Sequence, residues 1–98
     1  MIVVVFRSRL NAGVEAEITK TGEEMYALAS GMPGFLSYKD FAAEDGEFVT
    51  IIEFETLEQV NQWRDHPRHR EAQQRGREEF FQEYTIQVTE VIRTLRSS

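Results

Sequence analysis

The segment FLSYKDFAAEDGEFVTIIEFE, residues 35–55, decides the fold of this chain because it predicts a β-hairpin. Two runs rich in β-branched and aromatic residues, 35–43 and 47–55, are joined by Glu-Asp-Gly at 44–46. An Asp-Gly pair between two such runs is a strong hairpin signal, because glycine readily adopts the left-handed backbone of tight turns. We therefore expect two neighbouring antiparallel strands here.

A strand and a helix are predicted before this hairpin. Residues 1–10, MIVVVFRSRL, are mostly apolar and rich in valine, which favours a strand. Within residues 11–34, apolar side chains recur at helical spacing. Gly31 and Pro33 predict where this helix stops, with Gly31 in a left-handed conformation.

Two short helices and a last strand are predicted after the hairpin. Thr56 and Gln59 match the capping box that opens a helix. Pro67 suits the first position of a second helix, because its fixed φ fits there and its missing N–H is not needed. Residues 84–95, YTIQVTEVIRTL, predict the closing strand.

Together these elements predict one α+β domain over residues 1–98 with the ferredoxin-like split βαβ order. In that fold a four-stranded antiparallel sheet carries its helices on one face. A sheet covered on one face should alternate apolar and polar residues, yet residues 2–6 are all apolar and residues 49–54 nearly so. Each exposed Val, Ile or Phe forfeits roughly 1.5–3 kcal/mol of burial. We therefore expect the second face to pack against another copy of the chain in a homodimer.

Composition and charge narrow the classes of function. The formal charge is -6, from 17 acidic and 11 basic residues, which argues against nucleic acid and anionic membranes as partners. The chain has no cysteine, which excludes disulfides and thiolate metal sites. No stretch approaches the ~18 apolar residues needed to span a bilayer, so we expect a cytoplasmic protein with no membrane partner.

The segment NQWRDHPRHREAQQRG, residues 61–76, holds the only tryptophan and both histidines. His66 and His69 are three residues apart, and Asp65 is adjacent to the first of them. However, His66 precedes Pro67 at the start of a helix and is expected to point away from His69. Because a catalytic zinc site needs three protein ligands, we predict no metal site here.

His69 and Trp63 each allow a structural and a functional interpretation. His69 would lie near the positive end of a helix dipole and between two arginines, which disfavours its protonated form. A neutral imidazole could accept a proton from a phenol, or it could only hydrogen-bond a backbone group while it packs. Trp63 is either a core residue or a flat wall for a planar ligand. Gly76 removes bulk, so that either the sheet comes close or space is left for a ligand. Further candidates for a cleft between sheet and helices are Tyr26, Tyr38, Tyr84, Arg7 and Arg9.

The order and spacing of several short motifs resemble the antibiotic biosynthesis monooxygenase (ABM) family. These motifs are MPGFLSYKDF after the first helix, FVTIIEFET leading into LEQVNQWRDHPRH, and YTIQVTEVIR at the end. The resemblance spans the chain from Val4 to Arg93. It implies a dimeric α+β barrel of ferredoxin-like protomers, with a substrate cleft between sheet and helices in each protomer.

The resemblance also implies an activity. Several members of the family oxygenate electron-rich aromatic substrates such as anthrones and quinols with O2 and without metal, flavin or haem, so no cofactor is expected. A deprotonated phenolic substrate can itself give an electron to dioxygen. Trp63 and His69 match the family's helix tryptophan and histidine and are the implied catalytic residues. Trp63, Ser8 and Tyr84 are the expected substrate-binding residues.

Two other functions stay open at this point. A non-catalytic dimer that binds a small hydrophobic metabolite would use the same cleft, since one fold hosts many functions. One branch of the family degrades haem with an Asn on the first strand and a histidine that ligates the iron. Because this chain carries Ser8 and Gln73 at those positions, haem degradation is the least favoured of the three functions, with only His69 left to replace the ligand.

Overall fold

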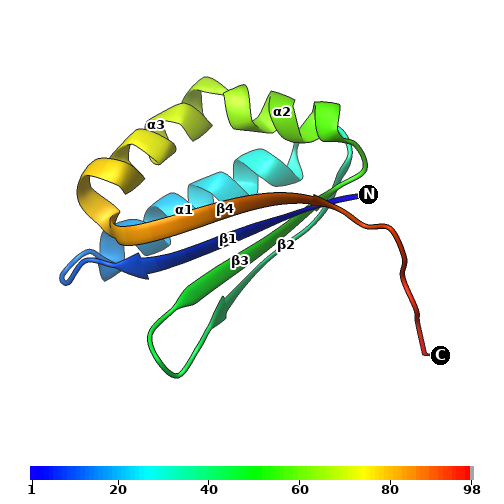
Figure 1. Ribbon diagram of the computed structural model, residues 1–98. Coiled ribbons are helices and arrows are strands. Elements are labelled where there is room, and N and C mark those ends of the chain that lie inside the picture. Colours follow the sequence, from blue (N-terminus) through cyan, green and yellow to red (C-terminus); the bar gives the residue numbers. More distant parts are fainter. Residues whose placement is uncertain (98) are drawn as a thin grey trace.

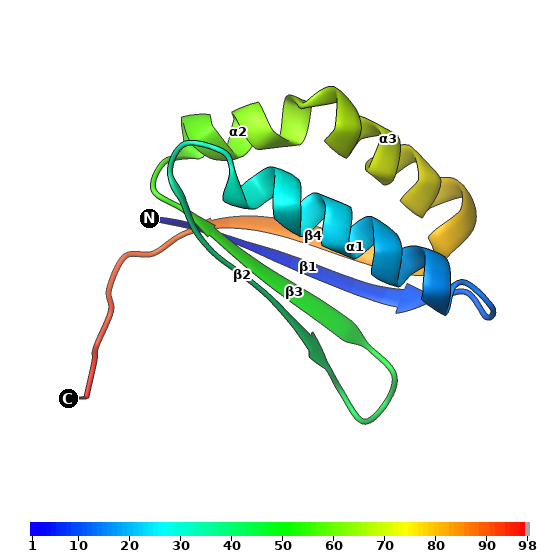
Figure 2. The same cartoon turned by 180° about the vertical axis from the view of Figure 1, so that it is seen from behind.

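The chain folds into one antiparallel sheet with its helices on a single face (Figure 1, Figure 2). The computed structural model describes residues 1–97. Its elements are β1 (Ile2–Leu10), α1 (Glu15–Ser30), β2 (Phe35–Ala42), β3 (Phe48–Phe54), α2 (Leu57–Asp65), α3 (Pro67–Arg75), the π-helical turn η1 (Gly76–Phe80) and β4 (Phe81–Glu90). The strand order β2-β3-β1-β4 is that of the ferredoxin-like split βαβ fold, which confirms the fold predicted from the sequence.

The hairpin between β2 and β3 closes at the predicted Asp-Gly pair. The Ala43 N–H donates to the Glu47 carbonyl at 2.8 Å, and the Gly46 N–H donates to the Ala43 carbonyl at 3.1 Å. Gly46 has φ +91°, the left-handed value that ends a three-residue hairpin loop. A short loop of this kind forces β2 and β3 to pair as neighbours.

The helices α2 and α3 begin where the sequence predicts. The Gln59 N–H donates to the Thr56 hydroxyl at 3.2 Å, and the Thr56 N–H donates to the Gln59 side-chain oxygen at 3.1 Å. These two bonds complete the capping box. Pro67 is the first residue of α3, and Nδ1 of His66 caps that helix by accepting the Arg68 N–H at 3.2 Å.

The stop of α1 differs from the prediction. Gly31 has φ -90° and is right-handed, whereas Gly34 has φ +80° and carries the left-handed turn. A Cβ atom on Gly34 would lie 1.8 Å from Oε1 of Gln59. The requirement for glycine therefore comes from close contact with the first turn of α2, which local sequence does not reveal.

The last strand starts three residues earlier than predicted, at Phe81, and ends at Glu90. The cause is η1, whose backbone leads directly from α3 into the sheet. Within this turn the Phe81 N–H donates to the Gly76 carbonyl. The Asn11 N–H, just beyond β1, donates to the Phe80 carbonyl at 2.8 Å and fixes η1 against the sheet.

Alternation along the strands gives the sheet two different faces. On the helix side, buried side chains form one cluster, made of Ile2, Val4, Ala29, Ile52, Phe54, Val60 and Trp63. On the other side, apolar side chains are only partly buried by their strand neighbours, with no helix over them (Figure 1). These side chains are Val3, Val5, Val49 and Ile51, and we call them the uncovered apolar face.

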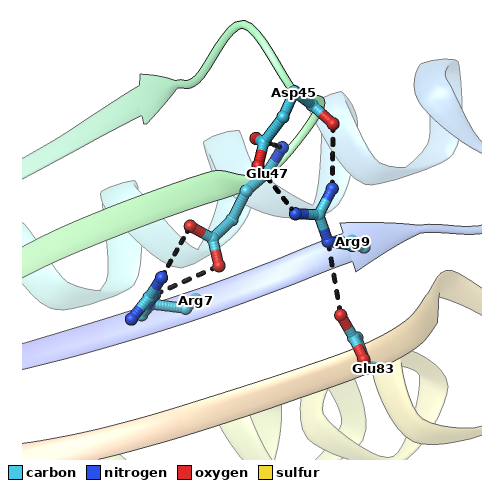
Figure 3. A network of polar contacts seen from close by, with 5 residues as sticks. All are labelled: Arg7, Arg9, Asp45, Glu47 and Glu83. Carbon is cyan, nitrogen blue, oxygen red and sulfur yellow. Dashed lines mark hydrogen bonds and ion pairs between the residues drawn. The ribbon is translucent and has the colours of Figure 1, made fainter.

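Arg7 and Arg9 also point to the side of the sheet away from the helices, where they tie β1 to its neighbours (Figure 3). Arg7 contacts Glu47 with two parallel bonds of 2.9 and 3.1 Å. Arg9 bonds Asp45 at 3.0 Å and Glu83 at 3.3 Å. The Glu47 backbone N–H and the Arg9 guanidinium hold the pKa of Asp45 below its usual range. These arginines are therefore occupied in joining β1 to the hairpin and to β4.

Candidate functional site

A cleft of about 910 Å³ lies between the helix side of the sheet and the helices. Its floor consists of three rows of side chains that pair across the strands. The rows are Tyr38, Ile52, Val4 and Val88; Asp40, Thr50, Phe6 and Ile86; and Phe48, Ser8 and Tyr84. Because neighbouring strands lie about 4.8 Å apart, the floor is about 15 Å wide from β2 to β4. A cleft of this size and mainly apolar character suits a small organic molecule.

One wall of the cleft is built where α2 meets α3. The rings of Trp63 and His69 are stacked, with centroids 4.2 Å apart and planes at 17°. Phe54 of β3 packs against the indole at 5.6 Å. Trp63 is only 5% exposed, so it has little free face left for a ligand. Its buried N–H has no hydrogen-bond partner within residues 1–97, which costs about 1–3 kcal/mol and leaves an unused donor in this wall.

His69 is held in its neutral form. Burial lowers the pKa of its imidazole, while the backbone carbonyls of Arg64 and Trp63 act in the opposite direction. The direction agrees with the prediction, but desolvation is the main cause, not the flanking arginines. Nε2 of Gln73 lies 3.4 Å from Nδ1 of the imidazole and fixes its orientation. A neutral, oriented imidazole can accept a hydrogen bond from a hydroxyl group.

The opposite wall is formed by α1 and β2 and carries hydroxyl and carboxylate groups. The rings of Tyr26 and Tyr38 meet edge to face at 5.5 Å. The Thr50 hydroxyl donates to Oδ1 of Asp40 at 2.6 Å. Burial, and to a lesser extent the charge of Asp40, raises the pKa of Tyr38 to about 12. The Tyr38 phenol therefore stays protonated at physiological pH and is available as a donor.

The β4 end of the cleft is aromatic. Phe6 and Phe81 meet edge to face at 5.2 Å, and Phe81 lies 5.9 Å from the ring of Tyr84. A Cβ atom on Gly76 would approach the Phe81 ring to 2.6 Å. Of the two interpretations that the sequence left open for Gly76, close approach is therefore correct, and the group that approaches is the Phe81 ring.

The structure brings all the predicted site residues to this one cleft: Trp63, His69, Ser8 and Tyr84. Ser8 is buried and lies opposite the half-exposed Tyr84 across β1 and β4. Tyr26 and Tyr38 also line the cleft, whereas Arg7 and Arg9 do not. Asp40 was not singled out, because in the sequence it is simply one polar position of an alternating strand. Only its register opposite Thr50 places it in the cleft. The roles of these residues remain predictions.

Residues 1–97 contain no group of three or more His, Asp or Glu side chains placed to hold a metal ion. One ring nitrogen of His66 is used in capping α3, apart from His69. None of the helices formed by these residues is both long and apolar enough to cross a bilayer.

Comparison with known proteins identifies the family. The model of the antibiotic biosynthesis monooxygenase family matches residues 1–75, and the chain therefore belongs to this family. The match includes Ser8, Trp63 and His69 and stops before Tyr84. The uncharacterized protein YqjZ of Bacillus subtilis (strain 168) is 32% identical over 74 residues, which cover 76% of this chain. The chain spans 65% of the length of that relative.

Solved structures of low sequence identity share the fold. Rv0793 from Mycobacterium tuberculosis superposes with a TM-score of 0.85 at 14% identity, covering 97% of this chain and 98% of that one. SnoaB from Streptomyces nogalater, described as a cofactor-independent oxygenase, gives a TM-score of 0.81 at 16% identity, with 98% and 97% coverage. At such identities the likeness establishes the ferredoxin-like fold alone.

Proposed function

We propose that this protein is a cofactor-independent monooxygenase that oxidises a small electron-rich aromatic substrate of the phenol, quinol or anthrone type with O2. The observation that carries this proposal is the neutral, partly buried His69, stacked on Trp63 in the wall of a mainly apolar cleft. Membership of the monooxygenase family supports it. So does the likeness in fold to SnoaB, which is described as a cofactor-independent oxygenase.

The substrate ring would lie against His69 and the aromatic end of the cleft. Because the indole of Trp63 has almost no free surface, its role is to support the imidazole from behind and not to stack on the substrate. Ser8 and Tyr84 carry hydroxyl groups at the opposite end of the floor from Tyr38, and there they would orient a polar group of the substrate. These contacts would hold the ring in a fixed orientation while the cleft limits access of water.

The chemistry needs a proton acceptor and an electron-rich substrate. A phenolic O–H would donate to Nδ1 of the neutral His69 imidazole, in place of the Gln73 amide that lies 3.4 Å from it. Because burial disfavours the imidazolium, His69 takes the proton only when the phenolate remains beside it. The phenolate can then give an electron to O2. For an anthrone, the CH2 carbon loses two hydrogens and gains one oxygen atom as a carbonyl, while the second oxygen atom leaves as water. The substrate thus supplies all four electrons that O2 takes up, and no external reductant is needed.

Oxygen consumption tests this proposal directly. The protein would be mixed with a panel of anthrones and quinols, and uptake compared between His69→Asn and the matched control His66→Asn. We expect His69→Asn to lower kcat/KM by about 10²–10⁴-fold, as for the loss of a general base. We expect His66→Asn to keep full activity, because asparagine caps a helix as well as histidine does. Equal loss in both variants, or no uptake by the unmodified protein, would contradict the proposal.

We also propose that the active form is a homodimer whose partner covers the uncovered apolar face. In addition, the segment 91–97 leaves the sheet as an extended strand-like tail (Figure 1) with Ile92 and Leu95 95% and 89% exposed. Burial of either apolar surface would lower the free energy relative to its exposure to water. An Ile51→Lys variant would place positive charges on both copies at the proposed interface. It should therefore sediment as a monomer at micromolar concentration, whereas the unmodified protein should sediment as a dimer. A single subunit in both samples would overturn this.

Binding without turnover is a second function that the same cleft could serve. Its apolar walls are sufficient to hold a planar metabolite. A quinol that quenches the fluorescence of the single tryptophan and is recovered unchanged would favour this function. Haem breakdown predicts instead a Soret band on haem addition, which disappears with reductant.

A further inference from the structure

The charged side chains that line the cleft are sorted by sign between its two walls. The wall formed by α1 and β2 carries only carboxylates, Glu15, Glu23 and Asp40. The wall formed by α2, α3 and η1 carries Arg64, Arg77 and the neutral His69. A molecule that lies across the floor therefore meets negative charge at one end and positive charge at the other.

The negative wall also contains a specific pair of hydrogen-bonding groups. Asp40 takes part in none of the ion pairs formed within residues 1–97, so its charge is not neutralised by a contacting cation. Its Oδ1 accepts the Thr50 hydroxyl, which fixes the carboxylate against the floor. Tyr38, one row further along β2, is a protonated donor at all physiological pH values. The Tyr38 phenol, a hydrogen-bond donor, and the Asp40 carboxylate, an anionic acceptor, therefore lie in neighbouring rows of β2.

We propose that Tyr38 and Asp40 form a second recognition point, which holds a hydroxyl or amino group at the end of the substrate remote from His69 and excludes a carboxylate there. The inference rests on the proposed function, in that His69 takes the reacting end of the same molecule. It defines the substrate class as a planar aromatic of two or three fused rings with a hydrogen-bond donor at its far end. A molecule with a single ring is too short to reach across the floor, which is about 15 Å wide from β2 to β4.

The selectivity follows from the charges. A hydroxyl or amino group can donate to the carboxylate of Asp40, and hydrogen bonds to charged groups are worth more than neutral ones. A carboxylate on the ligand would instead lie beside the carboxylates of Asp40 and Glu23, which are exposed at the rim of the cleft. Like charges at contact distance repel each other, more at a protein surface than in bulk water. At the other wall, Arg77 favours the phenolate that the reaction requires, whereas the charge of Arg64 is paired with Asp65 at 3.1 Å.

Calorimetric titration with a matched set of naphthalenes tests the inference without turnover. The ligands are 2-naphthol, 2,6-dihydroxynaphthalene, 6-amino-2-naphthol and 6-hydroxy-2-naphthoic acid, measured in the absence of oxygen. We expect the diol and the amine to bind about tenfold tighter than 2-naphthol, and the acid about tenfold weaker. Asp40→Asn should bring all four dissociation constants to within about threefold of one another.

A control and a second variant keep the test decisive. Glu44→Gln removes the same charge from the exposed tip of the same hairpin, outside the cleft, and should leave the tenfold ratios intact. If Asp40→Asn fails to fold, Tyr38→Phe should still reduce the advantage of the diol. Equal binding of the acid and the diol by the unmodified protein would overturn the inference, as would ratios that Asp40→Asn does not change.

The outcome is separable from that of the proposed function. Selective binding without oxygen uptake would leave the second recognition point standing and contradict the oxygenase. Oxygen uptake with no preference among the naphthalenes would do the reverse. Failure of all four ligands to bind would overturn the inference itself.

Discussion

The two ends of the helix-facing side of the sheet differ in how closely the helices cover them. At the end around Phe54, which is fully buried, the small Ala29 lets α1 approach the strands and Trp63 fills the remaining space. At the other end, Tyr84 and Ile86 are 40% and 50% exposed although they belong to the same face. The comparison indicates that the packed end supplies stability, whereas the open end keeps its apolar surface for a ligand.

Removing a large side chain from each end should have different effects on stability. We expect Phe54→Ala to lower the free energy of unfolding by about 3–5 kcal/mol, because it leaves a cavity in the packed end. Tyr84→Ala, at the open end, should cost less than about 1.5 kcal/mol and weaken ligand binding instead. Urea titration followed by circular dichroism measures both. Similar losses of stability in the two variants would show that the ends are equally packed.

Tyr38 lies at the border between the two ends. Its phenol should make the stability of the protein depend on pH in the alkaline range. Its pKa is raised to about 12, so the folded state holds the phenolic proton more tightly than the unfolded state. The stabilisation is complete below pH 10 and is lost as the pH rises from about 10 towards 12, by about 2–3 kcal/mol. Urea titrations at pH 9 and pH 11.5 should show a smaller loss for Tyr38→Phe than for the unmodified protein. Identical losses would mean that this phenol is not buried.

Gly22 of α1 and Gly76 of η1 differ in the space around them. A Cβ atom on Gly22 of α1 has open space around it, so Gly22→Ala should stabilise the protein by about 0.5–1 kcal/mol. A Cβ atom on Gly76 meets the Phe81 ring, so Gly76→Ala should gain nothing or lose about 1 kcal/mol. Thermal unfolding of both variants measures the difference. A gain in both would show that the Phe81 ring moves freely into the cleft.

A weaker effect is expected in mild acid. Because burial lowers the pKa of His69, the folded state binds its proton less readily than the unfolded state. Stability should therefore fall as the pH drops below about 6.5, the ordinary value for histidine. A His69→Gln variant should lose less stability than the unmodified protein between pH 7 and pH 5. Parallel curves for the two proteins would place the imidazole in water.

Local signals predicted the parts of the molecule that depend on neighbours in sequence. The Asp-Gly turn, the capping box at Thr56 and the first residue of α3 were all correct for this reason. The left-handed turn at Gly34 and the early start of β4 were missed, because each depends on contact between distant segments.

The candidate site divides in the same manner. Trp63 and His69 were found because their residue types are rare in this chain and match a family motif. Asp40 was missed because its role arises from strand register and from the acidic residues of α1, both of which require the assembled sheet. The sorting of charge between the two walls is likewise invisible in a chain that mixes both signs along its length.

The central claim is that the open end binds a planar aromatic molecule between two walls. One wall is formed by α2, α3 and η1 and holds His69, and the other is formed by α1 and β2 and holds Asp40. The most direct measurement is a nuclear magnetic resonance titration with 2,6-dihydroxynaphthalene, since the single indole N–H gives one unambiguous signal. We predict that the signals of the Trp63 indole and of the Tyr84, Ile86 and Asp40 amides move together at one saturable site, while that of Ile2 stays in place. Shifts confined to the uncovered apolar face, or a Trp63 signal that does not move, would contradict the account.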